Sequence, residues 1–179
     1  HSQGAEPLAV LSDAHIGAQQ ARGNEALTLV AQGAGTDYEA EFVQIMDELI
    51  GPDGDGGVLA EVKADFDDEE LTGHVDAAIA AAGEWRSAHE DLRAADDSGD
   101  YDTAVASAVG DEVGDAGRAF AALDAALTEA NAVAADRFAS ETDAAGRALG
   151  GLGTGVGVIT LIAMIAAALG LQRRISEYR

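Results

Sequence analysis

An uncharged apolar segment near the C-terminus constrains the fold of this chain more than any other feature. It runs from Ala148 to Leu171, 24 residues rich in Leu, Ile, Val, Ala and Gly. About 20 apolar residues in a helix, at a rise of 1.5 Å each, span the roughly 30 Å hydrocarbon core of a bilayer. A buried core helix is the alternative, for which 24 uncharged residues would be long. The segment therefore predicts a transmembrane helix over residues 147–171.

Arginines on one side of this segment predict its orientation. Arg173, Arg174 and Arg179 follow it, and the tail 172–179 carries a net charge of +2. Since the whole chain carries −23, the first 171 residues carry −25. Cytoplasmic flanks of membrane helices are enriched in Lys and Arg. We therefore expect a cell-membrane protein with an extracytoplasmic domain over residues 1–146, a single span and a short cytoplasmic tail.

The composition excludes several classes of function. A surface this acidic repels nucleic acid, because binding depends largely on Lys and Arg that neutralise phosphates. The chain has no cysteine, so disulfides, thiolate metal sites and cysteine nucleophiles cannot form.

Small residues recur at four-residue spacing around the apolar segment. The pairs are Gly146/Gly150, Gly151/Gly155 and Gly153/Gly157. This spacing lets two membrane helices approach closely, and it predicts either a homodimer or pairing with another transmembrane helix. The alternative is that glycine is simply common in alanine- and glycine-rich membrane helices.

Apolar residues at alternating steps of four and three predict long helices. The last helix should begin near Tyr101 and run without interruption to the C-terminus, because no proline lies in between. The rows of expected inward positions are Val109, Val113, Ala116, Phe120, Leu123, Leu127, Ala130, Ala134 and Phe138; Leu71, Val75, Ala78, Ala82, Trp85, His89 and Leu92; Tyr38, Phe42, Ile45 and Leu49; and Leu8, Leu11, Ala14, Ala18, Ala21, Leu27 and Val30.

These rows predict an all-α fold. Four long helical segments with short connections favour an antiparallel four-helix bundle whose last helix continues into the membrane. Thr36 and Glu39 have the spacing of a capping box, and Asp100 is placed to cap the helix that follows it. The acidic run 67–70 suits a helix N-terminus, and GPDGDGG at 51–57 predicts a turn.

No motif predicts catalysis or a metal. The loop from Asp53 lacks the glycine and glutamate that a calcium-binding loop requires. No pair of histidines has the i, i+4 spacing of a helical zinc site, and no nucleophile elbow or phosphate-binding loop occurs. We therefore expect no enzyme activity, no metal and no cofactor.

A cluster of polar residues on the first helix is a candidate ligand site. His15, Arg22 and Glu25 recur at helical spacing, and Arg22 is a rare cation able to hold a carboxylate such as that of an amino acid. An internal ion pair between Arg22 and Glu25, at i, i+3, is the competing interpretation. Trp85 and Arg86 form a second, weaker candidate.

The chain resembles known sensory proteins. A helical bundle beside a membrane span is similar to the ligand-sensing domains of bacterial chemoreceptors and sensor kinases. More narrowly, QQARGNEALTLVAQGAGTDYEAEF and LGLQRRISEYR resemble a family of actinobacterial membrane proteins associated with a glutamine-binding lipoprotein and the soluble serine/threonine kinase G. This resemblance implies a solute-binding lipoprotein outside and a kinase inside as partners.

Two functions remain open from the sequence. The first is a sensor or signal relay that detects a small solute, such as an amino acid, or a solute-binding protein, and passes a conformational change to a cytosolic partner. The second is an acidic anchored scaffold that recruits a partner protein without signalling.

Overall fold

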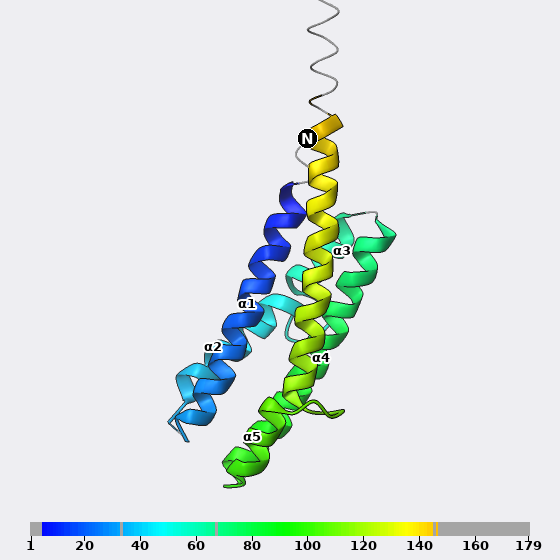
Figure 1. The fold of residues 1–179 in the computed structure, drawn as a ribbon. Coiled ribbons are helices and arrows are strands. Elements are labelled where there is room, and N and C mark those ends of the chain that lie inside the picture. Colours follow the sequence, from blue (N-terminus) through cyan, green and yellow to red (C-terminus); the bar gives the residue numbers. More distant parts are fainter. Residues whose placement is uncertain (1–4, 33, 67, 145, 147–179) are drawn as a thin grey trace, which may run out of the picture. The chain divides into compact units, whose positions relative to one another are not determined.

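The described part of the chain consists of helices (Figure 1). The computed structural model describes residues 5–32, 34–66, 68–144 and 146. It divides into two units, residues 1–137 and 138–179, which are described separately. Within the described residues no strand occurs, so the predicted all-α class is confirmed there.

Within the described residues five helices precede a further long one, which we call the last helix. They are α1 (Ala5–Val30), α2 (Thr36–Ile50), α3 (Gly57–Asp65), α4 (Glu69–Asp97) and α5 (Tyr101–Val109). The last helix covers residues 116–144, and its part up to Arg137 belongs to the first unit. The predicted turn at 51–57 separates α2 from α3.

The last helix packs antiparallel to α1 and to α4 in the first unit. His15 lies 2.7 Å from Asp124, and Ser12 lies 3.0 Å from Asn131, so α1 and the last helix run in opposite directions. Trp85 of α4 contacts Phe120 of the last helix, and Asp68, at the start of α4, pairs with Arg137. The last helix therefore also runs antiparallel to α4. These contacts do not by themselves establish the finer prediction of a four-helix bundle, which stays a prediction.

The core combines alanines with larger apolar side chains around the indole of Trp85. Every predicted inward position of α4 is buried, and Trp85 is completely enclosed. The ring of Phe42 contacts the Trp85 ring edge-on, with 5.1 Å between the ring centroids, and the centroid of the Phe120 ring lies at the same distance from that of Trp85. Alanines fill much of the remaining interior, namely Ala14, Ala18, Ala21, Ala78, Ala82, Ala104, Ala116, Ala130 and Ala134.

The prediction of a continuous helix from Tyr101 is wrong, because a non-helical segment at residues 110–115 interrupts it. Val109 and Val113, expected to point inward, are exposed. Gly114 has φ +97°, a conformation that favours glycine. The Asp115 carboxylate accepts a hydrogen bond from the Glu112 amide at 2.9 Å and so stabilises the break. The next helix begins at residue 116, and its predicted inward positions from Ala116 to Ala134 are buried, although Phe120 is only partly buried. The last position of the row, Phe138, is 41% exposed and was predicted incorrectly.

The inward face of α1 was also predicted incorrectly in its last two turns. Leu27 is 44% exposed and Val30 73% exposed, whereas Glu25, Thr28 and Leu29 are buried. The carboxylate of Glu25 determines this orientation, because its hydrogen-bond partners lie inside the protein (see below).

Helix starts agree with the sequence at two of three places. Asp68 caps α4 by accepting from the Leu71 amide at 2.8 Å, and Asp100 caps α5 by accepting from the Thr103 amide at 3.3 Å. The predicted capping box at Thr36 does not form, since the N-cap of α2 is Gly35 and makes no side-chain cap. The Glu39 carboxylate turns instead toward α4.

The predicted membrane protein is not supported. Among the residues that the structure describes, no helix has both the length and the apolarity needed to cross a bilayer. This finding overturns the predicted single-span, cell-membrane localisation. The segment 147–171, with Gly150, Gly153 and Gly157, lies outside the described residues, as do Arg173, Arg174 and Arg179. Gly146 is described as helical and exposed.

Candidate functional site

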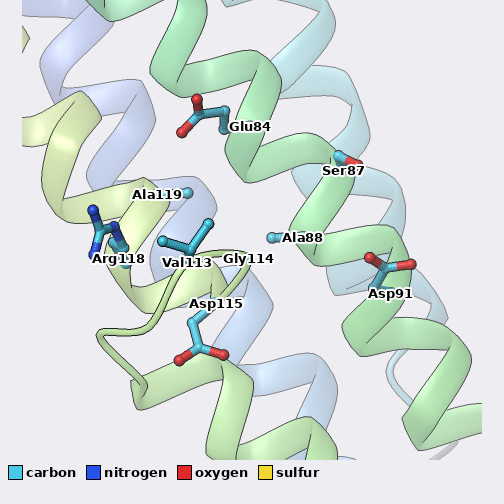
Figure 2. A pocket seen from close by; sticks show the side chains of 9 residues that line it. All are labelled: Glu84, Ser87, Ala88, Asp91, Val113, Gly114, Asp115, Arg118 and Ala119. Carbon is cyan, nitrogen blue, oxygen red and sulfur yellow. The ribbon is translucent and has the colours of Figure 1, made fainter.

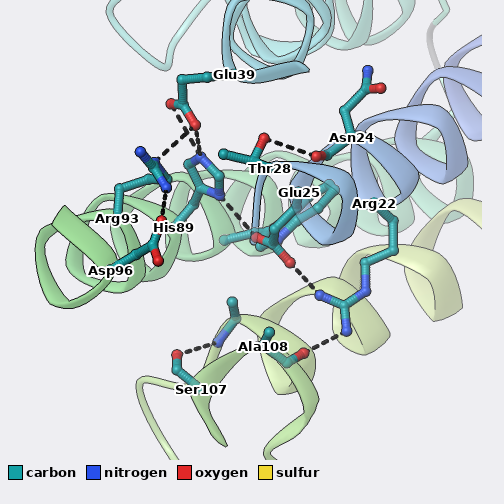
Figure 3. Close-up of polar contacts among 12 residues, drawn as sticks. Arg22, Asn24, Glu25, Thr28, Glu39, His89, Arg93, Asp96, Ser107 and Ala108 are labelled. Atoms are coloured by element: carbon teal, nitrogen blue, oxygen red, sulfur yellow. Dashed lines mark hydrogen bonds and ion pairs between the residues drawn. The ribbon is translucent and has the colours of Figure 1, made fainter. Parts of the chain in front are cut away.

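A fully buried carboxylate lies at the centre of the first unit. Glu25 of α1 has an exposed fraction of 0%. It accepts hydrogen bonds from Trp85 Nε1 at 3.0 Å and from the Arg22 guanidinium, and it faces His89 Nδ1 at 2.9 Å. Arg22 also donates to the carbonyl of Ala108 in α5. The predicted internal pair of Arg22 with Glu25 is therefore confirmed, and it belongs to a larger network (Figure 3).

The His89 ring joins this carboxylate to a second one. Its Nδ1 faces Glu25, and its Nε2 lies 3.0 Å from Glu39 Oε2. Because an ionised carboxylate only accepts hydrogen bonds, both contacts are hydrogen bonds at once only when both ring nitrogens carry a proton. The ring of Phe42 stacks on the imidazole at 3.7 Å, a geometry that suits a cation. The contacts of His89 therefore favour the imidazolium.

The pKa values of His89 and Glu39 shift in the directions that this pairing requires. Burial opposes the charged form of His89, but hydrogen bonds and charge attraction from Glu25 and Glu39 outweigh it and raise the pKa above 6.5. The hydrogen bond from His89 lowers the pKa of Glu39 below 4.5, against partial burial and with help from Arg93.

Charges of alternating sign continue from Glu39 to the surface of α4. Arg93 Nε lies 3.2 Å from Glu39 Oε2, and its two other nitrogens pair with Asp96 and Asp97. We refer to Arg22, Glu25, His89, Glu39 and Arg93 as the ion chain. It links α1, α2 and α4 and reaches α5 through Arg22.

The outer end of the ion chain opens into a groove between α2 and α4. The groove has a volume of about 550 Å³. Apolar side chains of α2 line one part of it, including Phe42, Val43 and Met46, and Glu39, His89 and Arg93 line another. Its four carboxylates, from Glu39, Asp47, Glu90 and Asp97, outnumber its two arginines. We call this cavity the α2–α4 groove.

Two side chains in the α2–α4 groove have unused hydrogen-bonding capacity. Arg86 donates to the carbonyls of Gly51 and Pro52 and to Asp47, which occupies three of its five N–H groups. Within the described residues Glu90 forms no hydrogen bond or ion pair. The groove thus presents a carboxylate and part of a guanidinium beside apolar surface.

The structure separates the predicted ligand residues into three places. Arg22, Glu25 and Trp85 meet in the core, and Arg86 lies in the α2–α4 groove. His15 pairs with Asp124 of the last helix and joins neither group. Sequence reasoning missed Glu39, Glu90 and Arg93 as groove residues, and it gave His89 only as an expected inward position.

A second groove lies on the other side of α4. Figure 2 shows its lining, which comes from Glu84, Ser87, Ala88 and Asp91 of α4, from the loop at Val113 and Gly114, and from Asp115, Arg118 and Ala119. It has a volume of about 410 Å³. Within the part of the chain that the structure describes, no buried ionic network reaches this groove, so it is the weaker candidate for a site.

Comparisons with known proteins give no match. A scan against protein-family models found none, and searches of curated proteins and of solved structures were equally negative. Within the described residues no group of three or more metal-binding side chains was found.

Proposed function

We propose that the chain is a solute-sensing helical module that binds a small zwitterion, such as an amino acid, in the α2–α4 groove. The observation that carries this proposal is the continuity between the groove and the ion chain, which share Glu39, His89 and Arg93. A solute that alters Glu39 acts directly on a group bonded to the buried centre. The role is binding and relay, without catalysis.

The chemistry of the groove defines the class of ligand. The unpaired carboxylate of Glu90 suits an ammonium group, and the free donors of Arg86 suit a carboxylate. Val43, which is 46% exposed, offers apolar surface to a side chain of the ligand. A site that combines apolar walls with a few convergent polar groups is the usual form of a small-molecule pocket.

The ion chain supplies a route for the signal. We take α1, α2, α4 and the last helix as an antiparallel four-helix bundle, in which a ligand-induced shift of α2 against α4 changes the Glu39–His89 contact. The effect reaches α1 through Glu25 and α5 through Arg22. A partner protein, such as a kinase or a solute-binding protein as the resemblance implies, would read this change.

Thermal stabilisation of the full chain by amino acids tests the proposal. A ligand that binds only the folded state stabilises it by about 2.7 kcal/mol at 100 times its Kd. The variants Glu90→Gln and Arg86→Gln should remove the stabilisation. Glu84→Gln, an exposed change on the same helix in the lining of the second groove and outside the α2–α4 groove, should retain it. If no amino acid stabilises the wild-type chain, the sensor proposal fails and the predicted scaffold function gains support.

A further inference from the structure

The outward face of α1 differs from the rest of the surface in its charge. Nine residues of α1 between Ala9 and Val30 are exposed, and only Asp13 among them is charged. On α4, in contrast, seven of thirteen exposed residues are acidic. In a chain of net charge −23, an exposed helix face almost free of charge needs an explanation.

This face has the residue spacing of a helix-packing surface. Ile16, Gln20, Gly23, Leu27 and Val30 follow one another in steps of 4-3-4-3, the pattern of coiled-coil contacts. Ile16 is 56% exposed, and it lies on the same stripe as the exposed Leu27 and Val30. We call these five residues the α1 stripe.

A groove beside the α1 stripe leaves room for another helix. It lies between α1 and α2, has a volume of about 560 Å³, and includes Gln20, Gly23 and Leu27. A Cβ added at Gly23 would meet no atom within 4 Å. Glycine here removes the side chain that would hold a neighbouring backbone away.

The stripe is complementary to itself when a second copy runs antiparallel. A two-fold axis midway between Gln20 and Gly23 places Ile16 opposite Leu27 of the second copy, and Gln20 opposite Gly23. The same axis places Asp13 opposite Val30, so like charges do not face each other. Such an isologous contact uses one patch on both subunits.

We propose that the chain forms a symmetric homodimer through antiparallel pairing of the α1 stripe. The charge distribution supports a second copy as the occupant, since a chain of −23 repels its own copies over most of its surface but not along this stripe. A helix of 26 residues is about 39 Å long. With the two-fold axis between Gln20 and Gly23, the part of α1 that pairs with itself runs from Asp13 to Val30, which is about 27 Å at 1.5 Å per residue and about two and a half heptads.

Salt dependence separates this occupant from its main competitor. Glu41 and Glu48 line the α2 side of the groove, so a basic helix of another protein is the competing partner. Two acidic copies repel each other at long range, and salt screens that repulsion. Homodimerisation should therefore strengthen between about 0.1 M and about 1 M NaCl, whereas binding of a basic helix should weaken.

Sedimentation equilibrium of the full chain measures the dimer directly. Ile16→Glu and Leu27→Glu should each weaken dimerisation at least about 100-fold, because a symmetric contact contains each substitution twice. The matched control is Val109→Glu, an exposed valine outside the stripe, which should leave the dimer constant unchanged. Far-UV circular dichroism verifies that each variant keeps its helices.

A charge-pair variant tests the antiparallel arrangement itself. In the double variant Ile16→Glu/Leu27→Arg, each Glu faces an Arg of the other copy, so dimerisation should recover relative to either single change. In a parallel pair, Glu would face Glu and no recovery would occur. A monomeric wild-type chain in about 1 M NaCl, or a dimer insensitive to both single variants, overturns the proposal. These outcomes are independent of whether an amino acid binds the α2–α4 groove.

Discussion

Replacing Glu25 by glutamine is the sharpest test of the ion chain. The change keeps the size of the side chain but removes its charge, and it leaves Arg22 and His89 without their shared counter-ion. Glutamine keeps one of the two acceptor oxygens of the carboxylate. Its NH₂ group replaces the other oxygen and faces a side chain that is itself a hydrogen-bond donor. Removing one partner of a buried ion pair costs about 3–5 kcal/mol when the remaining charge is left uncompensated, and in this variant that charge is Arg22, since His89 keeps Glu39.

This loss is large compared with the stability of a typical protein, about 5–15 kcal/mol. For a chain of this size, 1 kcal/mol corresponds to about 2–4 °C in Tm, so we expect a decrease of roughly 6–20 °C. Urea unfolding measures the free energy, with far-UV circular dichroism for the helices and fluorescence for Trp85, the chain's one tryptophan. Trp85 Nε1 donates to Glu25, so its emission reports on the same site.

The matched control is Glu90→Gln, which makes the same chemical change at an exposed residue without a partner. It should alter the free energy of unfolding by less than about 0.5 kcal/mol. Adding Arg22→Met to Glu25→Gln should cost less than the sum of the two single changes, since the two side chains share one interaction. A Glu25→Gln variant within about 1 kcal/mol of the wild type would refute the argument that the ion chain stabilises the fold.

Three further predictions concern pH, packing and backbone conformation. Because folding raises the pKa of His89, the stabilisation that its imidazolium provides is complete below pH 6.5 and is lost as the pH rises through the pKa of the folded state. The urea midpoint should therefore fall over this pH range, and in His89→Gln it should change less with pH. Leu123→Ala empties a fully buried position and should reduce the free energy of unfolding by about 2–5 kcal/mol in the same assay, and a loss below 1 kcal/mol would contradict the described core. Gly57→Ala should destabilise more than Gly54→Ala, although both have positive φ, because a Cβ at Gly57 would lie 2.6 Å from the backbone of Leu49 while Gly54 faces open space; equal melting temperatures would contradict this.

The sequence was most informative where one helix face carries large apolar residues. On α4 the spacing of Leu71, Val75, Trp85 and Leu92 is unambiguous, and all four are buried. The end of α1 was misread because alanine and glycine occur on several of its faces, so apolar spacing does not identify the inward one. A buried Glu25 reverses the usual rule that carboxylates point to solvent.

The break before residue 116 and the α2–α4 groove depend on contacts that sequence spacing does not show. Without a proline, only glycines mark the break, and a Cβ at Gly117 would lie 2.5 Å from the carbonyl oxygen of Gly110. The i, i+3 pair of Arg22 with Glu25 was predictable because both residues lie on one helix. The link from Glu25 through His89 to Glu39 joins three helices, so it follows from the packing and not from any local pattern.

The ion chain also compensates for a weakness of an alanine-rich core. Alanines at successive turns, such as Ala14, Ala18 and Ala21 on α1, present similar shapes, so a helix displaced by one turn would bury much the same surface. Hydrogen-bonded ions do not tolerate such a displacement. A helix that slides by one turn moves by about 5.4 Å, which would carry each charge out of hydrogen-bonding distance of its partner. Buried polar groups that fix helix register at some cost in stability are known from coiled coils. In this protein the groups that would fix the register reach the α2–α4 groove through Glu39, so the ligand that we propose there would act on a contact between α2 and α4.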